Sequence, residues 1–358
     1  MLRRFVLALT VLALAGSAAS LASGAAKPAF PTSGTGRAYS WHDTPTGSTA
    51  SLRGLSAVSA STAWSSGSGG TVLRTVDRGA TWQAIGPSGT DTLQFRDIEA
   101  FDADRAVILS IGNGSDSRIY VTSDGGQSWT LAFVNDDANA FYDCMTFFDD
   151  RRGLALSDPP DGVKFRILAT SDGGQSWHVV DPAGMPAALS GEFAFAASGQ
   201  CIASDHGRRA WFGTGGGAQA RVFRSDDRGQ TWSVSPTPIL SSPTAGIFSL
   251  AFKGQQHGLA VGGDFAAPTA SPDNFASTDD GGSTWQLVPG APPEYRSGAA
   301  WVDGHTVIAV GPSGSDVSTN GGTSWRRFDD GSLHTTDCAS PVSCWASGAD
   351  GRAAYLVR

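Results

Sequence analysis

Cysteines, charged residues and long apolar segments are all scarce in this sequence. Its 358 residues contain 4 cysteines, too few for disulfide bonds to form the framework of a chain of this size. Charged residues make up only 16%, whereas glycine is abundant at 46, and this composition favours many short strands and turns over helices. The apolar run at residues 5–15 is shorter than the ~20 residues that a membrane-spanning helix needs.

The sequence also lacks the patterns that indicate a cofactor or a nucleic-acid partner. The formal net charge is −8, which argues against a general nucleic-acid binder. No G-x-G-x-x-G stretch opens a helix after a strand, and the 6 histidines and 4 cysteines show no metal-ligand spacing. We therefore expect no cofactor, no metal ion and no nucleic-acid partner.

Residues 1–25 have the pattern of an export signal. A short basic segment precedes the apolar residues 5–15, and small residues after them offer cleavage positions. Ser17 stands where a bacterial lipobox has its lipidated cysteine, so we expect no lipid anchor. We expect a periplasmic or secreted protein with no integral membrane segment after cleavage, and a signal retained as an anchor is the alternative. Residues 26–36, small and Pro-containing, are expected to form a flexible lead-in.

An eight-residue repeat dominates the rest of the chain. Six copies read (S/T)-x-D-x-G-x-(S/T)-W, except that the last has Asn in place of Asp. Their closing tryptophans lie 47, 48, 55, 53 and 40 residues apart, a period typical of a four-stranded propeller blade. The copies are residues 75–82, 122–129, 170–177, 225–232, 278–285 and 318–325.

Each position of the repeat has a task in one tight turn between two strands. The Asp side chain accepts hydrogen bonds from backbone N–H groups of its own turn, and the Gly adopts a positive φ that a Cβ would penalise. The Trp begins the outgoing strand and packs against its blade. We therefore expect a structural role for Asp77, Asp124, Asp172, Asp227, Asp280 and Asn320.

The segments around these repeats predict seven units of alternating, strand-like sequence. The seventh unit begins at His334 and ends at Arg358 without a fourth strand, and residues 37–43, which include Trp41, are expected to supply it. The sequence thus predicts an all-β fold, a seven-bladed β-propeller of four-stranded antiparallel blades, as a single domain over residues 37–358. The predicted first strands of the first six units are residues 52–58, 95–101, 142–148, 193–197, 247–252 and 297–302.

The four cysteines predict one disulfide. Cys338 and Cys344 are spaced across a hairpin of the last unit and are expected to pair. Cys144 aligns with the start of a first strand, and Cys201 with the start of a second strand in the next unit. Those positions lie at opposite ends of a blade, more than about 10 Å apart, so both are expected to be buried thiols.

The starts of the first strands are expected to line one mouth of the central channel. Several polar or aromatic residues fall there or on nearby loops, and they are candidates for a ligand pocket. A water-filled channel mouth without a specific ligand is the alternative. The candidate ligand-binding residues are Arg53, Arg96, Tyr142, Asp143, Asp158, Glu192, Tyr295, Arg296 and His334, and Asp97 and Phe248 are expected at the same mouth.

A carbohydrate-acting hydrolase is the alternative function. Sialidases hold a carboxylate with three arginines and use a Tyr/Glu pair, and the three arginines Arg53, Arg96 and Arg296 with Tyr142 and Glu192 resemble such a set. The Arg-Ile-Pro motif of those enzymes is absent, however, and they have six blades. The sequence therefore identifies no catalytic residue.

Two resemblances extend this interpretation. The repeat resembles the Asp-box, or BNR repeat, of sialidases and related β-propellers, where it stands away from the active site. Further stretches resemble the bacterial relatives of the photosystem II assembly factor Ycf48, which implies an exported, monomeric binding or assembly scaffold that holds a protein, a small molecule or a carbohydrate. These stretches are Phe141-Tyr-Asp, Leu156-Ser-Asp-Pro, Gly191-Glu-Phe-Ala-Phe-Ala-Ala-Ser and Trp211-Phe-Gly-Thr-Gly-Gly.

Overall fold

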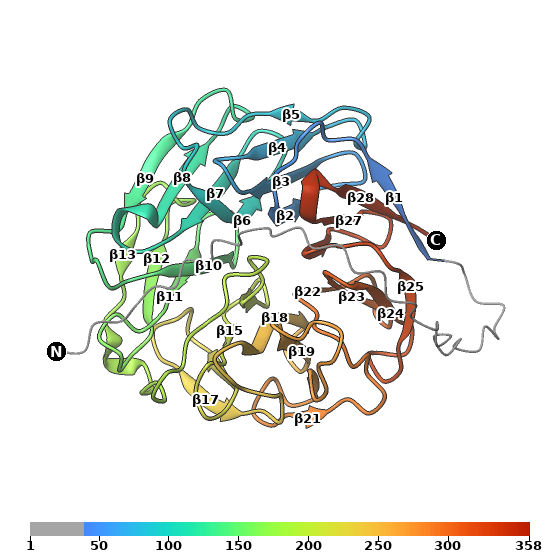
Figure 1. The fold of residues 1–358 in the computed structure, drawn as a ribbon. Coiled ribbons are helices and arrows are strands. Elements are labelled where there is room, and N and C mark those ends of the chain that lie inside the picture. Colours follow the sequence, from blue (N-terminus) through green and yellow to red (C-terminus); the bar gives the residue numbers. More distant parts are fainter. Residues whose placement is uncertain (1–38) are drawn as a thin grey trace, which may run out of the picture. The chain divides into compact units, whose positions relative to one another are not determined.

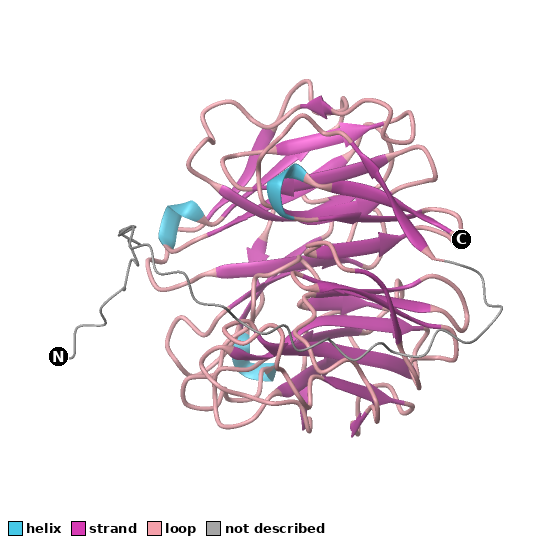
Figure 2. Ribbon diagram, turned by 45° about the vertical axis from the view of Figure 1, so that its right-hand side comes forward, coloured by secondary structure: helices cyan, strands magenta, loops and turns pink. Residues whose placement is uncertain are grey.

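The computed structural model describes residues 39–358, and these form seven four-stranded antiparallel sheets in a ring (Figure 1). Figure 2 shows how little of this part is helical: three single turns, η1 (Gly114–Asp116), η2 (Pro182–Gly184) and η3 (Ala349–Gly351). The all-β, seven-bladed propeller predicted from the sequence is confirmed. The predicted export signal and lead-in lie outside the described residues. Within residues 39–358, no helix has the length and apolar character needed to cross a membrane.

In blades 1 to 6 the four strands follow one another in sequence from the channel to the rim. The first three blades are β2 (Leu52–Ala57), β3 (Ala63–Gly67), β4 (Val72–Thr75) and β5 (Gln83–Ala84); β6 (Gln94–Ala100), β7 (Ala106–Ile111), β8 (Arg118–Thr122) and β9 (Thr130–Val134); β10 (Tyr142–Phe147), β11 (Gly153–Ser157), β12 (Arg166–Thr170) and β13 (His178–Val179). The next three are β14 (Ile202–Ser204), β15 (Ala210–Gly213), β16 (Arg221–Ser225) and β17 (Ser233–Pro236); β18 (Ala245–Lys253), β19 (His257–Asp264), β20 (Phe275–Thr278) and β21 (Gln286–Leu287); β22 (Gly298–Trp301), β23 (Val307–Gly311), β24 (Gly314–Ser318) and β25 (Arg326–Asp329).

The core lies between neighbouring blades. Trp64 of β3, for example, is fully buried in a cluster with Phe95 and Ile98 of β6 in the next blade. First strands of neighbouring blades contact one another all the way round the ring, β2 and β26 (Thr335–Cys338) included. Because both faces of each blade are covered in this way, a regular first strand presents only its backbone edge to the channel.

Blade 4 differs from the sequence-based prediction. The predicted first strand, residues 193–197, is not a strand, and the innermost strand of the blade is β14. The prediction was wrong because the alternation of Phe193, Phe195 and Ala197 suggests a half-buried strand. The rings of Phe193 and Phe195 instead join Phe248 and Tyr295 in a cluster that is separate from the interblade cores.

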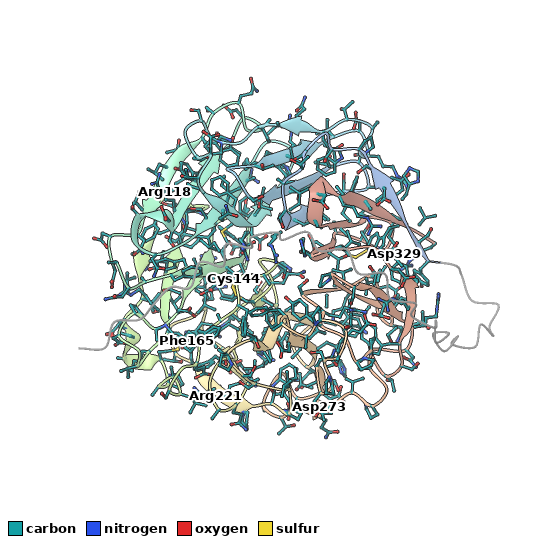
Figure 3. All side chains as sticks on the ribbon, in the orientation of Figure 1. Arg118, Cys144, Phe165, Arg221, Asp273 and Asp329 are labelled. Carbon is teal, nitrogen blue, oxygen red and sulfur yellow. A yellow bond between two sulfur atoms is a disulfide. The ribbon has the colours of Figure 1, made fainter. Side chains whose placement is uncertain are left out.

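The prediction for Cys144 and Cys201 was also wrong, because the structure joins them in a disulfide with the Cα atoms 6.1 Å apart. The error follows from blade 4: Cys201 directly precedes a first strand, not a second one, so it lies at the same end of the blade as Cys144 of β10. Figure 3 shows Cys144 on the channel side of the ring. The structure also has the predicted disulfide between Cys338 and Cys344, which face each other across the hairpin of β26 and β27 (Cys344–Ser347).

Each Asp-box forms the turn between the third and fourth strands of its blade, at the outer rim. In the box of blade 2, Asp124 accepts from the backbone N–H of Ser128 at 2.9 Å and from its hydroxyl at 2.5 Å. Thr122 Oγ1 accepts from the N–H of Gly126, whose φ is +83°. Asn320 Oδ1 accepts from the backbone N–H of Ser324, and Asn320 Nδ2 donates to the Ser324 hydroxyl, so an amide fills the same turn with one bond reversed.

Acid should weaken these turns, because an Asp side chain accepts both bonds only when it is ionised. In the box of blade 5, the backbone N–H and hydroxyl of Thr284 lower the pKa of Asp280 to about 2. The stabilisation is therefore complete above the ordinary Asp pKa of about 4 and is lost as the pH falls through the folded pKa. Urea unfolding at pH 7 and pH 2.5 should show a smaller acid-induced loss of stability for Asp280→Asn than for the wild type.

Two further variants make this measurement specific. Asp280→Ala should lose about 1 kcal/mol at pH 7, because both accepted bonds are gone. Asp91→Asn removes an exposed carboxylate outside the boxes and should keep the wild-type pH dependence. Equal acid-induced losses in Asp280→Asn and the wild type would contradict the prediction.

The ring is closed in blade 7 by the two ends of the propeller. Its sheet has the order β26, β27 (Cys344–Ser347), β28 (Ala353–Val357) and β1 (Ser40–Thr44), and in Figure 1 the blue β1 lies beside the red β28. The pairing is antiparallel over five residues, from Ser40 opposite Val357 to Thr44 opposite Ala353. Trp41 is buried against blade 6, and its Nε1 donates to Ser315 Oγ at 3.0 Å. The closure predicted from the sequence is confirmed.

Removal of β1 should destabilise the whole ring. A chain that begins at Pro45 lacks the outer strand of blade 7 and the Trp41 packing, and it exposes the edge of β28 to other chains. We expect a lower melting temperature and aggregation in size-exclusion chromatography, compared with a chain that begins at Gly36. Equal melting temperatures would mean that β1 does not hold the ring closed.

Candidate functional site

Residues 193–200, which we call the floor segment, cross the channel. Hydrogen bonds tie this segment to all six other blades. Arg96 of β6 donates to the Ala196 carbonyl at 2.7 Å, and the Ala194 N–H donates to Asp158, after β11, at 2.8 Å. Blades 1, 5, 6 and 7 are each joined to the segment by at least one hydrogen bond. In that order, these bonds run from Arg53 to Ala197, from Leu250 to Gln200, from Ser198 to Ser297 and from Thr335 to Ser198.

The floor segment divides the channel into two cavities. The mouth cavity has a volume of 610 Å³ and is lined by the starts of the first strands and by residues 193–197. The lower cavity, of 440 Å³, is lined by the later parts of the same strands and by residues 198–200. Asp97 faces the lower cavity, where its carboxylate accepts from the Met145 N–H at 2.6 Å, so it lies outside the mouth at which it was expected. The lower cavity does not contain any of the other predicted site residues.

Four side chains enter the mouth cavity because each stands at a β-bulge. The pairing register shifts between Leu52 and Gly54, between Phe95 and Asp97, between Tyr142 and Cys144, and between Ile247 and Ser249. A bulge carries an extra, unpaired residue that re-aims its side chain. The four extra residues are Arg53, Arg96, Asp143 and Phe248, and all four line the cavity.

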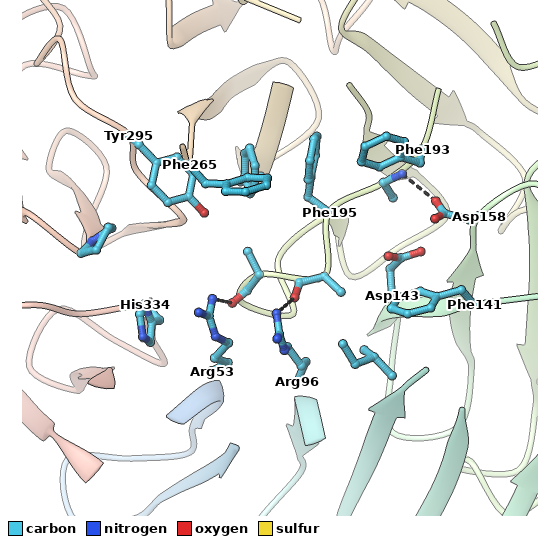
Figure 4. Close-up of a pocket in the computed structure, with 16 residues that line it drawn as sticks. Arg53, Arg96, Phe141, Asp143, Asp158, Phe193, Phe195, Phe265, Tyr295 and His334 are labelled. Atoms are coloured by element: carbon cyan, nitrogen blue, oxygen red, sulfur yellow. Dashed lines mark hydrogen bonds between the residues drawn. The ribbon is translucent and has the colours of Figure 1, made fainter. Parts of the chain in front are cut away.

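Two arginines form one side of the mouth cavity (Figure 4). Within residues 39–358, neither Arg53 nor Arg96 forms an ion pair. Each donates one N–H to a backbone carbonyl of the floor segment. Burial, and then the charge of Arg53, lower the pKa of Arg96 to about 10, so both stay charged at neutral pH. Burial and the two arginines lower the pKa of His334 beside them to about 3, so it is neutral.

Two carboxyl groups face each other on another side of the cavity, as Figure 4 shows for Asp143 and Asp158. Asp143 is 1% exposed, and burial, followed by repulsion from Asp158, raises its pKa well above the ordinary value. Burial raises the pKa of Asp158 to about 7, against the opposing effect of the bond from the Ala194 N–H. The pair therefore holds a proton near neutral pH and does not carry its full negative charge.

Aromatic rings cover the rest of the mouth cavity. Phe195 of the floor segment stacks on Phe248 at 4.0 Å, and Phe248 meets Tyr295 edge-on at 4.7 Å. Phe193 packs on Phe195 at 4.9 Å, and the half-exposed Phe265 lies 6.3 Å from Phe195. The cavity thus combines an apolar wall with a few charged groups, as small-ligand and peptide pockets do.

The structure brings together six of the nine candidate ligand-binding residues: Arg53, Arg96, Asp143, Asp158, Tyr295 and His334. The other three lie elsewhere. Tyr142 precedes a bulge and points into the core between blades 2 and 3, 5.4 Å from Phe133 of β9. The sialidase-like set of three arginines with a Tyr/Glu pair is therefore not assembled.

Ion pairs inside the blades explain the positions of Glu192 and Arg296. Glu192 is buried, pairs with Arg221 and accepts from Thr214 at 2.6 Å. Arg296 is fully buried and donates to Asp316 at 2.8 Å. The sequence does not show whether a charged residue beside a first strand points into the channel or forms an ion pair within its own blade. Glu192 and Arg296 do the latter.

Sequence reasoning missed the aromatic residues Phe141, Phe193, Phe195 and Phe265. Phe141 stands directly before the predicted pair at 142 and 143, and Phe193 and Phe195 were assigned to a strand. Phe265 lies on the loop after β19, and no local pattern marks it. Only the position of the floor segment shows that these rings share one cavity.

The rim turns and the ring of blades define the class of this protein as an Asp-box β-propeller. Residues 223–234 match the family model of the BNR/Asp-box repeat. None of the curated proteins matches the sequence.

Two solved structures of YCF48 are similar in fold. YCF48 from Cyanidioschyzon merolae matches with a TM-score of 0.64 at 16% identity, over 88% of this chain and 98% of that chain. YCF48 bound to D1 peptide matches with a TM-score of 0.61 at 16% identity, over 89% and 95%. The Ycf48-like, BNR-repeat propeller that the sequence resembles is thus confirmed as the fold.

A glycoside hydrolase shares this fold as well. The GH74 enzyme of Niastella koreensis matches with a TM-score of 0.60 at 13% identity, over 87% of this chain and 53% of that chain. At such identities the similarity shows the fold alone. The function has to be argued from the mouth cavity.

The floor segment should depend on Gly199. Its φ is +75°, and a Cβ there would lie 2.4 Å from Asp97 Oδ1. Gly199→Ala should therefore loosen the floor segment, lower the melting temperature and speed hydrogen exchange of amides in residues 193–200, measured by mass spectrometry. Gly89→Ala is a matched control, because Gly89 also has a φ of +75° but has no atom near its Cβ position. Both variants carry the backbone strain of about 1 kcal/mol or more, and only Gly199→Ala should expose the floor.

Proposed function

We propose that this protein is an exported binding or assembly scaffold that holds a peptide segment of a partner, or a small ligand, in its mouth cavity. The observation that carries the proposal is a cavity that is closed at its floor and open at its mouth, with aromatic walls and two arginines that have no ion-pair partner within residues 39–358. Its 610 Å³ lie within the 300–1,000 Å³ typical of ligand pockets. The floor segment gives the pocket a bottom, so a ligand enters and leaves by the mouth.

The comparisons support a peptide as the ligand. A propeller of the same fold has been solved as YCF48 bound to D1 peptide. In this chain the formal net charge is −8, yet the mouth concentrates two arginines beside a carboxyl pair that holds a proton. The mouth is therefore locally suited to an acidic or terminal carboxylate group of a peptide, although the chain as a whole is acidic.

Export is supported by the predicted signal at residues 1–25 and by two disulfides, because disulfides persist in oxidising compartments. Both bridges lie in the propeller itself, so the folded chain suits the periplasm or the medium. Cell fractionation that finds the chain with reduced cysteines in the cytosol would contradict export.

A carbohydrate-acting hydrolase is the second candidate, and the facing carboxyls of Asp143 and Asp158 favour it. Glycosidases use one protonated and one ionised carboxyl group, and the pKa of Asp158 near 7 suits a general acid. The fold is also that of a GH74 enzyme. Against this candidate, the floor segment blocks the channel below the mouth cavity, so a polysaccharide chain could not pass through the channel.

Peptide panning tests the scaffold proposal. A displayed library of random peptides, panned on the wild type, should yield binders, and Arg96→Gln should weaken them at least tenfold because the anion-binding charge is halved. Arg151→Gln, an exposed position on the β10–β11 hairpin, is the matched control and should not change the affinity. Equal affinities of Arg96→Gln and the wild type would mean that the peptides bind outside the mouth cavity.

The same variants separate the two functions. Fluorogenic glycosides should not be hydrolysed by the wild type if the protein is a scaffold. Turnover that disappears in Asp158→Asn, at an unchanged melting temperature, would instead assign a hydrolase.

A further inference from the structure

Asp143 is the exception among the buried carboxyl groups of the blades. Its Oδ2 is shielded from solvent and has no hydrogen-bond partner within residues 39–358. The other buried carboxylates are satisfied: Asp97 by the Met145 N–H, Glu192 by Arg221 and Asp316 by Arg296. A buried polar atom without a partner costs about 1–3 kcal/mol, so it requires an explanation. Asp143 lines the mouth cavity and has no ion-pair partner within residues 39–358, so a cationic ligand group in the cavity would meet an unpaired carboxyl group.

The surroundings of Asp143 suit a positively charged donor. Asp158 faces it, and Phe141 and Phe193 lie beside the pair in Figure 4. An ammonium group has three N–H donors, enough to reach both carboxyls, and aromatic faces attract cations. Phe141 and Phe193 both line the same cavity.

The opposite requirement holds at Arg53 and Arg96. Each guanidinium carries five N–H donors, of which the structure shows one in use on the floor segment. Two adjacent arginines without a carboxylate partner suit a carboxylate of a ligand, which each can bind with paired N–H groups. Figure 4 shows the arginines and the carboxyl pair at different places around the same space, with the rings of Phe195 and Phe265 across from them.

We propose that the mouth cavity binds an amino acid or a short peptide with both charged ends free. Asp143 and Asp158 would hold its ammonium group, Arg53 and Arg96 its carboxylate, and the aromatic wall its apolar side chain. This inference rests on the proposed function and names the class of ligand. Free amino acids and short peptides share this chemistry, and the experiment distinguishes them.

Calorimetric titration with four probes tests the proposal. L-Phenylalanine and triphenylalanine carry both charges, 3-phenylpropionate carries only the carboxylate, and 2-phenylethylamine carries only the ammonium group. At least one of the two doubly charged probes should bind at least tenfold more tightly than either singly charged probe. The tighter of the two identifies a free amino acid or a peptide as the natural size of ligand.

Variants assign the two ends. Asp143→Asn keeps the shape of the side chain but removes one of the two acidic groups that share the proton, so the doubly charged probe should no longer bind more tightly than 3-phenylpropionate. With Arg96→Gln, the doubly charged probe should no longer bind more tightly than 2-phenylethylamine. Asp136→Asn and Arg151→Gln, both at exposed positions, are the matched controls and should bind as the wild type does. Melting temperatures identify any variant that does not fold, and the probe comparison on the wild type then decides.

Three outcomes would overturn the inference. Equal affinity for 3-phenylpropionate and the doubly charged probes would make the mouth an anion site only, and equal affinity for 2-phenylethylamine would make it a cation site only. In both cases the proposed binding function stands. If none of the probes binds and panning does enrich Arg96-dependent peptides, the free charged ends are not recognised. If panning fails as well, the proposed function fails with the inference.

Discussion

The alternation of side chains along a β-strand is the constraint on which the mouth cavity depends. Both faces of each blade are covered by neighbouring blades, so successive side chains of a first strand enter one or the other interblade core. At the mouth, first-strand side chains reach the channel where this alternation is broken. Bulges break it at Arg53, Arg96, Asp143 and Phe248, and these four positions bring two cations, an acid and an aromatic ring into one space.

The floor segment solves a second problem of the channel. First strands leave backbone groups unpaired along their inner edges, and buried backbone groups need partners. The floor segment meets part of this need from the centre: Gln200 accepts from the Leu250 N–H, and its side chain donates to the Thr336 carbonyl at 2.8 Å. The Cys144–Cys201 bridge fixes the end of the segment to the strand that carries Asp143. The shape of the mouth cavity is thus held by contacts from every blade.

Stability and binding are separated in space. The Asp-boxes lie at the rim, where each is completed by contacts within eight residues, and they hold the outer strands. The mouth lies at the inner ends of the blades and combines burial, charge and aromatic rings. Changes at the rim therefore act on the turns of the blades, whereas changes at the bulges act on the mouth cavity and its floor. A similar propeller fold occurs in YCF48 and in a GH74 enzyme, so the fold by itself does not define the function.

The sequence by itself determined the seven blades, the Asp-box turns and the closing strand around Trp41, because each depends on local turn chemistry or on a pattern that repeats. It also located Asp158 on a loop near the mouth, and six further mouth residues through their place at the start of a first strand: Arg53, Arg96, Asp143, Phe248, Tyr295 and His334. Only the tertiary structure decided that Glu192 and Arg296 each form an ion pair with a residue of their own blade. It also decided that Cys144 bonds to Cys201 and that residues 193–200 form a floor. The floor contacts join residues as far apart as Arg53 and Ala197, 144 positions along the chain, and no local pattern encodes a contact of that kind.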